Sequence, residues 1–129
     1  MGLDMYLIGE KLTSTRDIVD GYKVSSVSLD LGQWRKHWAL HKYIMDMIHP
    51  MDGAKIELDA EEMRRIADAV EQGKLPDAKE WAHYRDEDRI TFHKKPNQVA
   101  KTLKILRDAA DWLDKEDNAW KSVEYYGSW

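Results

Sequence analysis

Residues 3–12 read Leu3-Asp4-Met5-Tyr6-Leu7-Ile8-Gly9-Glu10-Lys11-Leu12 and alternate as a β-strand does. Leu3, Met5 and Leu7 fall on one face, because neighbouring side chains of a strand point to opposite faces. The other face carries Tyr6 and Ile8. Since both faces hold large side chains, we expect a central strand rather than an edge strand.

Other segments complete the set of expected strands and loops. Tyr22–Leu31 and the tail Trp120–Trp129 both show strand-like alternation. Ile90–Phe92 is long enough only for a short strand. Thr13–Gly21 is polar and predicts a loop, whereas Asp77–Asp88 is highly charged and fits no single pattern.

Three segments predict helices. The first runs from Gln33 to Ile48, and Pro50 follows it. The second opens on Asp59 with Glu62 three residues later, a capping box, and ends at Gly73. The third starts at Pro96, a favoured first helical residue, and reaches Lys115. The chain is therefore predicted to be α+β, with a small antiparallel sheet that includes both terminal strands, about three helices packed on it, and one domain over residues 1–129.

The composition limits the possible functions. The 129 residues carry a net charge of -4, which argues against a protein that coats nucleic acid through its overall charge. The absence of cysteine excludes disulfides and thiolate chemistry. No secretion signal and no run of roughly 18 apolar residues is present. We expect a soluble protein of the cytoplasm.

Three patches resemble a family of small proteins encoded by bacteriophages and prophages. They are the start Met1–Leu7, the segment Gln33–Tyr43 with its Trp-Arg-Lys and His-Lys-Tyr groups, and the ending Tyr125–Trp129. Ile90–Phe92 departs from the family, which often has a phenylalanine-rich stretch there. Because the family has no established activity, the resemblance implies a phage origin, the host cytoplasm and an accessory role.

Positive charge precedes two of the predicted helices, where the helix dipole favours negative charge. Arg35 and Lys36 open the first helix, and Lys94 and Lys95 precede the third, whose end is rich in Asp. An anion at such a helix start would meet free backbone N–H groups and several cations. The alternative is that these cations pair with acids of the same chain.

Aromatic and histidine residues offer further candidates. Trp34 and Trp38, beside Arg35, could stack the bases of a single-stranded nucleic acid, or they could anchor the core. His37 and His41 share a helix face and could hold one metal ion, or they could pack in the core. The spacing designates no third metal ligand and no catalytic group, so we predict neither a metal nor another cofactor.

The leading interpretation is a phage accessory protein that acts by binding a host protein or complex, such as a bacterial immune system. An alternative is a protein that binds a nucleotide or nucleotide signal in a pocket lined by Arg35, Lys36, His41, Lys94 and Lys95. A weaker alternative is an enzyme of nucleotide or nucleic-acid metabolism. The candidate binding residues are Trp34, Arg35, Lys36, Trp38, His41, Lys94 and Lys95.

Overall fold

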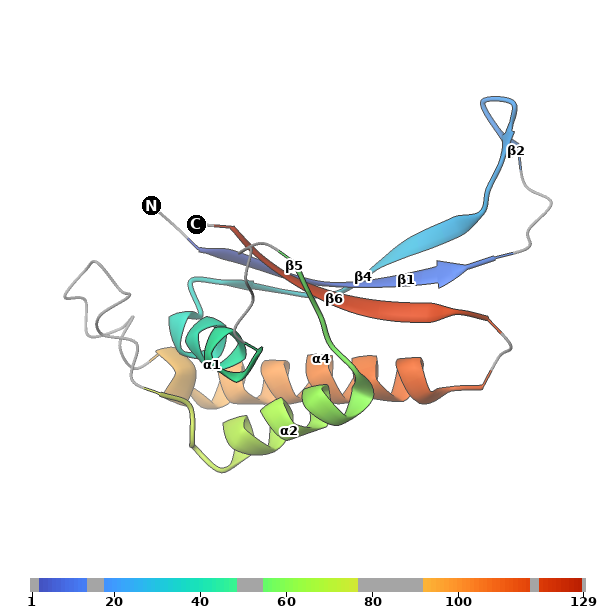
Figure 1. Ribbon diagram of the computed structural model, residues 1–129. Coiled ribbons are helices and arrows are strands. Elements are labelled where there is room, and N and C mark those ends of the chain that lie inside the picture. Colours follow the sequence, from blue (N-terminus) through green and yellow to red (C-terminus); the bar gives the residue numbers. More distant parts are fainter. Residues whose placement is uncertain (1–2, 14–17, 49–54, 77–91, 117–118, 129) are drawn as a thin grey trace.

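The computed structural model describes residues 3–13, 18–48, 55–76, 92–116 and 119–128. Within these ranges the chain forms a four-stranded antiparallel sheet in the order β4-β1-β6-β5 (Figure 1). The described strands and helices are β1 Asp4–Leu12, β2 Ile18–Val19, β3 Tyr22–Lys23, β4 Ser26–Arg35, α1 Trp38–Ile48, β5 Lys55–Glu57, α2 Ala60–Glu71, α4 Pro96–Asp114 and β6 Lys121–Ser128. The predicted α+β fold, with both terminal strands in the sheet, is confirmed.

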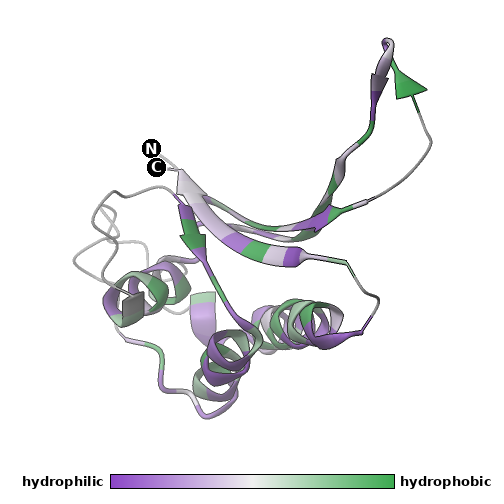
Figure 2. Cartoon of the chain, turned by 45° about the vertical axis from the view of Figure 1, so that its right-hand side comes forward, coloured by the Kyte–Doolittle hydropathy of each residue, from purple (hydrophilic) through white to green (hydrophobic). Residues whose placement is uncertain are grey.

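Strand β1 lies between β4 and β6, as the sequence predicted. Leu3, Met5 and Leu7 are completely buried, because the three described helices pack against that face of the sheet. Tyr6 and Ile8 alternate with these residues along β1 and therefore lie on the opposite face. The described ranges place no helix over that face (Figures 1 and 2). Within the described ranges, helices therefore cover one side of the sheet, and we call the other side the open face.

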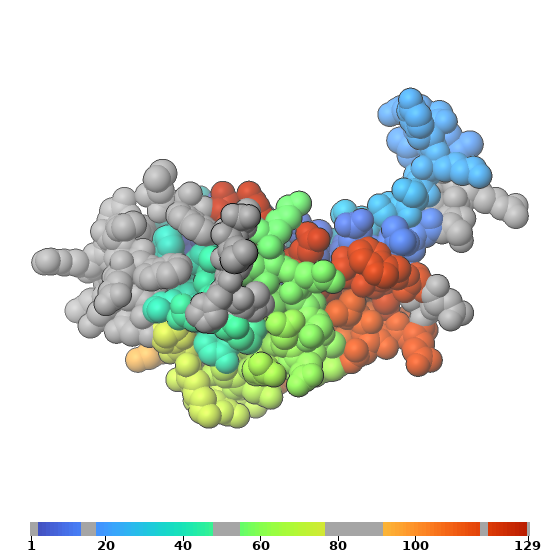
Figure 3. Space-filling view, in the orientation of Figure 1, coloured from blue at the N-terminus to red at the C-terminus, as the bar shows by residue number. Residues whose placement is uncertain are grey.

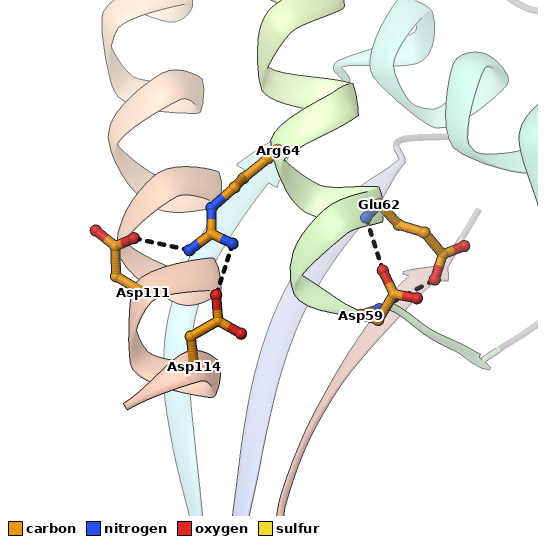
Figure 4. Close-up of polar contacts among 5 residues, drawn as sticks. All are labelled: Asp59, Glu62, Arg64, Asp111 and Asp114. Atoms are coloured by element: carbon orange, nitrogen blue, oxygen red, sulfur yellow. Dashed lines mark hydrogen bonds and ion pairs between the residues drawn. The ribbon is translucent and has the colours of Figure 1, made fainter. Parts of the chain in front are cut away.

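Helix α2 forms as its sequence indicates. The Asp59 carboxylate accepts a hydrogen bond from the Glu62 N–H at 2.7 Å, and the Glu62 carboxylate accepts one from the Asp59 N–H at 3.0 Å (Figure 4). Gly73 follows the helix with a φ of 68°, the left-handed conformation that glycine adopts without strain. The predicted apolar stripe of Met63, Ile66, Ala67 and Val70 is buried.

Helix α4 is flanked by both the sheet and α2. Its acidic end, which opposes the helix dipole, is explained by partners on α2. Arg64 donates to Asp111 at 3.1 Å and to Asp114 at 2.6 Å (Figure 4). For these acids, pairing within the chain is the correct interpretation.

The first helix was predicted to begin too early. Gln33 to Arg35 continue strand β4, where Met5 is paired with Trp34 and Asp4 with Arg35. The helix begins only at Trp38, after Lys36 turns the chain with a φ of 59°. The segment 33–35 forms a strand rather than a helix because it pairs with β1. Trp34 fits the helical spacing only because its side chain would reach the core from a helix as well as from a strand.

Two other segments also differ from expectation. Part of the predicted loop 13–21 pairs with Tyr22–Lys23 as the β2–β3 hairpin, around a turn at Asp20 and Gly21, whose φ values are 51° and 84°. Phe92 begins a short 3-10 turn that ends at Lys94, so it does not lie on a strand. Ile90, Thr91 and the segment Asp77–Asp88 lie outside the described residues, as does Pro50.

The β2–β3 hairpin and the adjoining ends of β1 and β4 project from the body of the molecule (Figures 1 and 3). We call this projection the arm. Its exposed large apolar residues are Leu12, Ile18, Val19, Tyr22, Val27 and Leu29.

Candidate functional site

Three of the seven predicted binding residues lie in the core. Trp34 is 2% exposed, Trp38 is 9% exposed and His41 is 1% exposed. The Trp34 indole N–H donates a hydrogen bond to the Thr102 hydroxyl of α4 at 3.0 Å. Base stacking on Trp34 and Trp38 is therefore contradicted, and the alternative that they anchor the core is confirmed.

His37 and His41 are buried between α1 and its neighbours. The His37 Nδ1 accepts a hydrogen bond from the Leu40 N–H at 3.3 Å, and the His41 Nδ1 lies 2.5 Å from the Tyr125 hydroxyl. Burial lowers the pKa of His37 to about 3, with help from the positive charges of His93 and Lys101, and burial lowers the pKa of His41 to about 4. Burial also raises the pKa of Tyr125.

A metal site receives no support from the described ranges, which hold no group of three or more His, Cys, Asp or Glu side chains suited to a metal ion. His37 precedes α1 rather than lying within it. The hydrogen bonds of His37 and His41 give both rings a structural role.

The remaining predicted residues lie at one end of the molecule. Arg35 ends strand β4 and Lys36 follows it, whereas Lys94 and Lys95 lead into α4. The two segments meet through an edge-on contact between the His37 and Phe92 rings, whose centroids are 5.3 Å apart. We call Arg35, Lys36, Lys94, Lys95 and Lys101 the cationic end.

Lys101 was not among the predicted binding residues. It lies one turn into α4, close enough for its charge to act on His37. The sequence could have identified Lys101, because it lies early in a helix whose first turn has no acidic residue. Only the packing of β4 against α4 shows that it is close to Arg35, because both residues line one depression.

Few ion pairs neutralise the cationic end within the described part of the chain. Within the described ranges, Lys36, Lys94, Lys95 and Lys101 form no ion pair, and Arg35 has only an exposed contact with Asp4 at 3.5 Å. By contrast, most cations on the helices have an acidic partner: Lys42, Arg64, Arg65, Lys104 and Arg107. Other lysines without a described ion pair are separated along the chain: Lys23 lies on β3, Lys55 on β5, Lys74 after α2 and Lys115 at the C-terminal end of α4.

Three depressions adjoin the cationic end, and in one of them, of about 480 Å³, Lys101 lies with Lys104, Asp30 and Asp108. The remaining two have different linings. One, of about 390 Å³, is lined by Asp4, Tyr6, Gln33, Trp34, Arg35 and Lys101. The other, of about 460 Å³, lies between the end of α2 and the start of α4 and includes Lys94 and His93. Arg35 and Lys94 thus line different depressions, and His41 lines neither. The residues expected to line a single nucleotide pocket therefore do not share either of these two depressions.

Lys36 and Asp20 are the non-glycine residues with positive φ in the described ranges. Asp20 lies in a tight turn, where this conformation is common, but Lys36 lies within the cationic end. The left-handed conformation costs a residue with a Cβ atom about 1 kcal/mol. Strained residues of this kind cluster at functional sites.

Replacing Lys36 with glycine separates stability from binding. We expect Lys36→Gly to raise the free energy of unfolding by about 1 kcal/mol, because the strain is removed. The same change should weaken the binding of inorganic tripolyphosphate, because one cation is lost. Asp20→Gly, at a similar φ on the arm, is the control and should leave binding unchanged. Urea denaturation and calorimetric titration measure the two effects, and equal binding by both variants would contradict a role for Lys36.

No known protein-family model, curated protein sequence or solved structure matches this chain. None of the helices in the described ranges is long and apolar enough to cross a membrane. The α+β architecture and the cationic end are accordingly the findings on which a function must rest.

Proposed function

We propose that this chain acts by binding and that the cationic end holds an anionic partner. One observation carries the proposal: five cations lie at the end of β4, in the β4–α1 turn and at the start of α4, segments joined by the His37–Phe92 contact, and among the described residues only Asp4 forms an ion pair with any of them. Uncompensated like charges repel one another, so their grouping destabilises the free protein. A bound anion would remove that repulsion.

The start of α4 adds a second attraction at the same place. Lys95 precedes the helix without a side-chain cap for the first N–H groups, and the first turn carries no acid. Pro96 has no N–H and the Gln98 and Val99 N–H groups donate within the chain, so the helix dipole and the Asn97 N–H are what favour an oxyanion there. Lys94 and Lys95 would add charge-assisted hydrogen bonds, which are stronger than neutral ones.

The sequence resemblance and the arm support a particular kind of partner. The phage-like patches support a partner in a bacterial host, such as a component of an immune system. The exposed apolar residues of the arm, with Tyr22 79% and Ile18 65% exposed, favour a protein among the partners, because such patches are typical of contact surfaces. A phosphate-bearing ligand at the cationic end is the alternative.

Charge reversal tests the proposal. We expect the double variant Lys94→Glu/Lys95→Glu to bind tripolyphosphate at least tenfold more weakly than the original chain, since each charge contributes about 1 kcal/mol at contact distance in water. The original chain should also bind less tightly as salt is added. Calorimetric titration at low and at physiological salt measures both effects.

The matched control is Lys23→Glu/Lys115→Glu, which makes the same change of charge at two exposed lysines, one on β3 and one at the opposite end of α4. It should bind as the original chain does. Equal losses in both double variants would mean that only net charge matters, and the cationic end would then not be a site. Capture of host proteins from a bacterial lysate by the original chain, lost in the Lys94/Lys95 variant, would extend the result to the natural partner.

A further inference from the structure

Two tyrosines lie side by side on the open face of the sheet. Tyr6 of β1 and Tyr126 of β6 are directly paired across the two central strands. Their ring centroids are 6.2 Å apart and the rings are tilted by 30°. Both side chains are half-buried, so a ring surface remains accessible on a face over which no described helix lies.

The tyrosine pair adjoins the cationic end. Tyr6 lines the same depression of about 390 Å³ as Arg35 and Lys101, together with the Gln33 amide. In the sheet, Gln33 is the neighbour of Tyr6 on β4, and Lys55 is the neighbour of Tyr126 on β5. The four strands therefore place the row Gln33, Tyr6, Tyr126 and Lys55 across the open face.

The next row along the open face has the opposite charge. Ile8 is flanked there by Asp30 of β4 and Glu124 of β6, and Glu124 is paired with Glu57 of β5. A polyanion lying on the open face would be repelled from this acidic row. The favourable region is thus confined to the end of the sheet that holds the tyrosines and the cations.

We infer that the open face binds a short stretch of single-stranded nucleic acid, with bases stacked on Tyr6 and Tyr126 and phosphates toward Arg35 and Lys101. Sheets that display aromatic residues on central strands bind about two or three unpaired bases in this way. Aromatic stacking combined with a cationic track is the general means of holding single strands. The acidic row limits the site to such a short stretch.

This inference rests on the proposed function, because it names the anionic partner of the cationic end. The proposed stacking residues are the accessible Tyr6 and Tyr126, in place of the buried Trp34 and Trp38. A protein partner would need only the charges, whereas a single strand needs the charges and the exposed rings together. The overall charge of -4 agrees with a local site rather than with coating of nucleic acid.

The test compares two labelled probes of equal charge: an eight-nucleotide oligothymidine and an abasic oligonucleotide with the same phosphates. Fluorescence anisotropy should show tighter binding of the oligothymidine by the original chain. Tyr6→Ala and Tyr126→Ala should each weaken oligothymidine binding by about 5- to 100-fold, the range given by alanine substitution at stacked bases. Neither change should alter binding of the abasic probe.

Matched variants separate stacking from charge and from unfolding. Tyr6→Phe keeps a ring and should bind nearly as well as the original chain, and Tyr22→Ala removes an exposed tyrosine on the arm without effect. Lys101→Glu should weaken both probes, whereas Asp4→Asn, which removes the only described acid paired with Arg35, should strengthen both. Circular dichroism verifies that each variant is folded.

The outcomes distinguish the two proposals. If both probes bind equally and the tyrosine variants change nothing, the stacking inference is wrong and the anion site stands. A second outcome is that neither oligonucleotide binds, whereas tripolyphosphate or a captured acidic protein binds and needs Lys94 and Lys95. In that case too, the stacking inference is wrong and the anion site stands. If no anionic probe and no lysate partner binds, both proposals fail.

Discussion

The unfolding free energy is expected to fall by about 4 kcal/mol between pH 7 and pH 5, through His37 and His41. Both rings are buried and neutral, with pKa values of about 3 and about 4, against 6.5 in the unfolded chain. Below pH 6.5 the two histidines bind protons in the unfolded chain but remain neutral in the folded chain. Each histidine then lowers the free energy of unfolding by about 1.4 kcal/mol per pH unit, and the two together lower it by about 2.7 kcal/mol per pH unit.

The sign of this effect follows from the lowered pKa values. The stabilising contribution is fully present above pH 6.5 and is lost as the pH falls toward 4. Protonation of His37 would also remove the acceptor of the Leu40 N–H and would place a charge near His93 and Lys101. Since domains of this size are stable by about 5–15 kcal/mol, acid unfolding is expected near pH 4 to 5.

Urea denaturation between pH 7.5 and pH 4.5, followed by tryptophan fluorescence, measures this slope. The variant His37→Asn keeps an acceptor for the Leu40 N–H but does not titrate, and it should lose about half of the slope. His41→Gln should lose the other half. A stability that is level from pH 7 to pH 5, or a slope that survives in the double variant, would contradict the roles assigned to these rings.

The second large effect is expected from Trp34→Ala, which should lower the unfolding free energy by about 3–5 kcal/mol. The indole is 2% exposed and its N–H donates to Thr102, which is completely buried on α4. The substitution opens a cavity between β4 and α4 and leaves the Thr102 hydroxyl without this donor. Denaturation followed by far-ultraviolet circular dichroism is the measurement, because the change removes a fluorophore.

Milder variants separate the two roles of Trp34. Trp34→Phe keeps most of the volume and should cost only about 1–2 kcal/mol. Combined with Thr102→Val, it forms a double-mutant cycle that isolates the hydrogen bond, expected to contribute about 1 kcal/mol. If Trp34→Ala kept full stability, the core role assigned to Trp34 would be wrong.

The candidate site could be predicted only in part. Lys36, Lys94 and Lys95 were identified because positive charge before a helix is a local anomaly, visible in the sequence. Trp34, Trp38 and His41 were assigned to the same surface because helical spacing cannot tell an exposed stripe from a buried one. The contact between Tyr6 and Tyr126 could not be predicted from the sequence. The two residues are 120 positions apart, and only the antiparallel pairing of β1 with β6 brings them together.

Local interactions determined what the sequence alone established. The capping box of α2, the proline at the start of α4 and the alternation of β1 each act within a few residues, so their effects can be read along the chain. Tertiary structure decided the rest. Strand β4 continues to Arg35 because Met5 and Asp4 offer it pairing partners, and this pairing brings Arg35 beside Lys101 and next to the tyrosines. These contacts join residues that are distant in the sequence, so their energies depend on packing that no local pattern encodes.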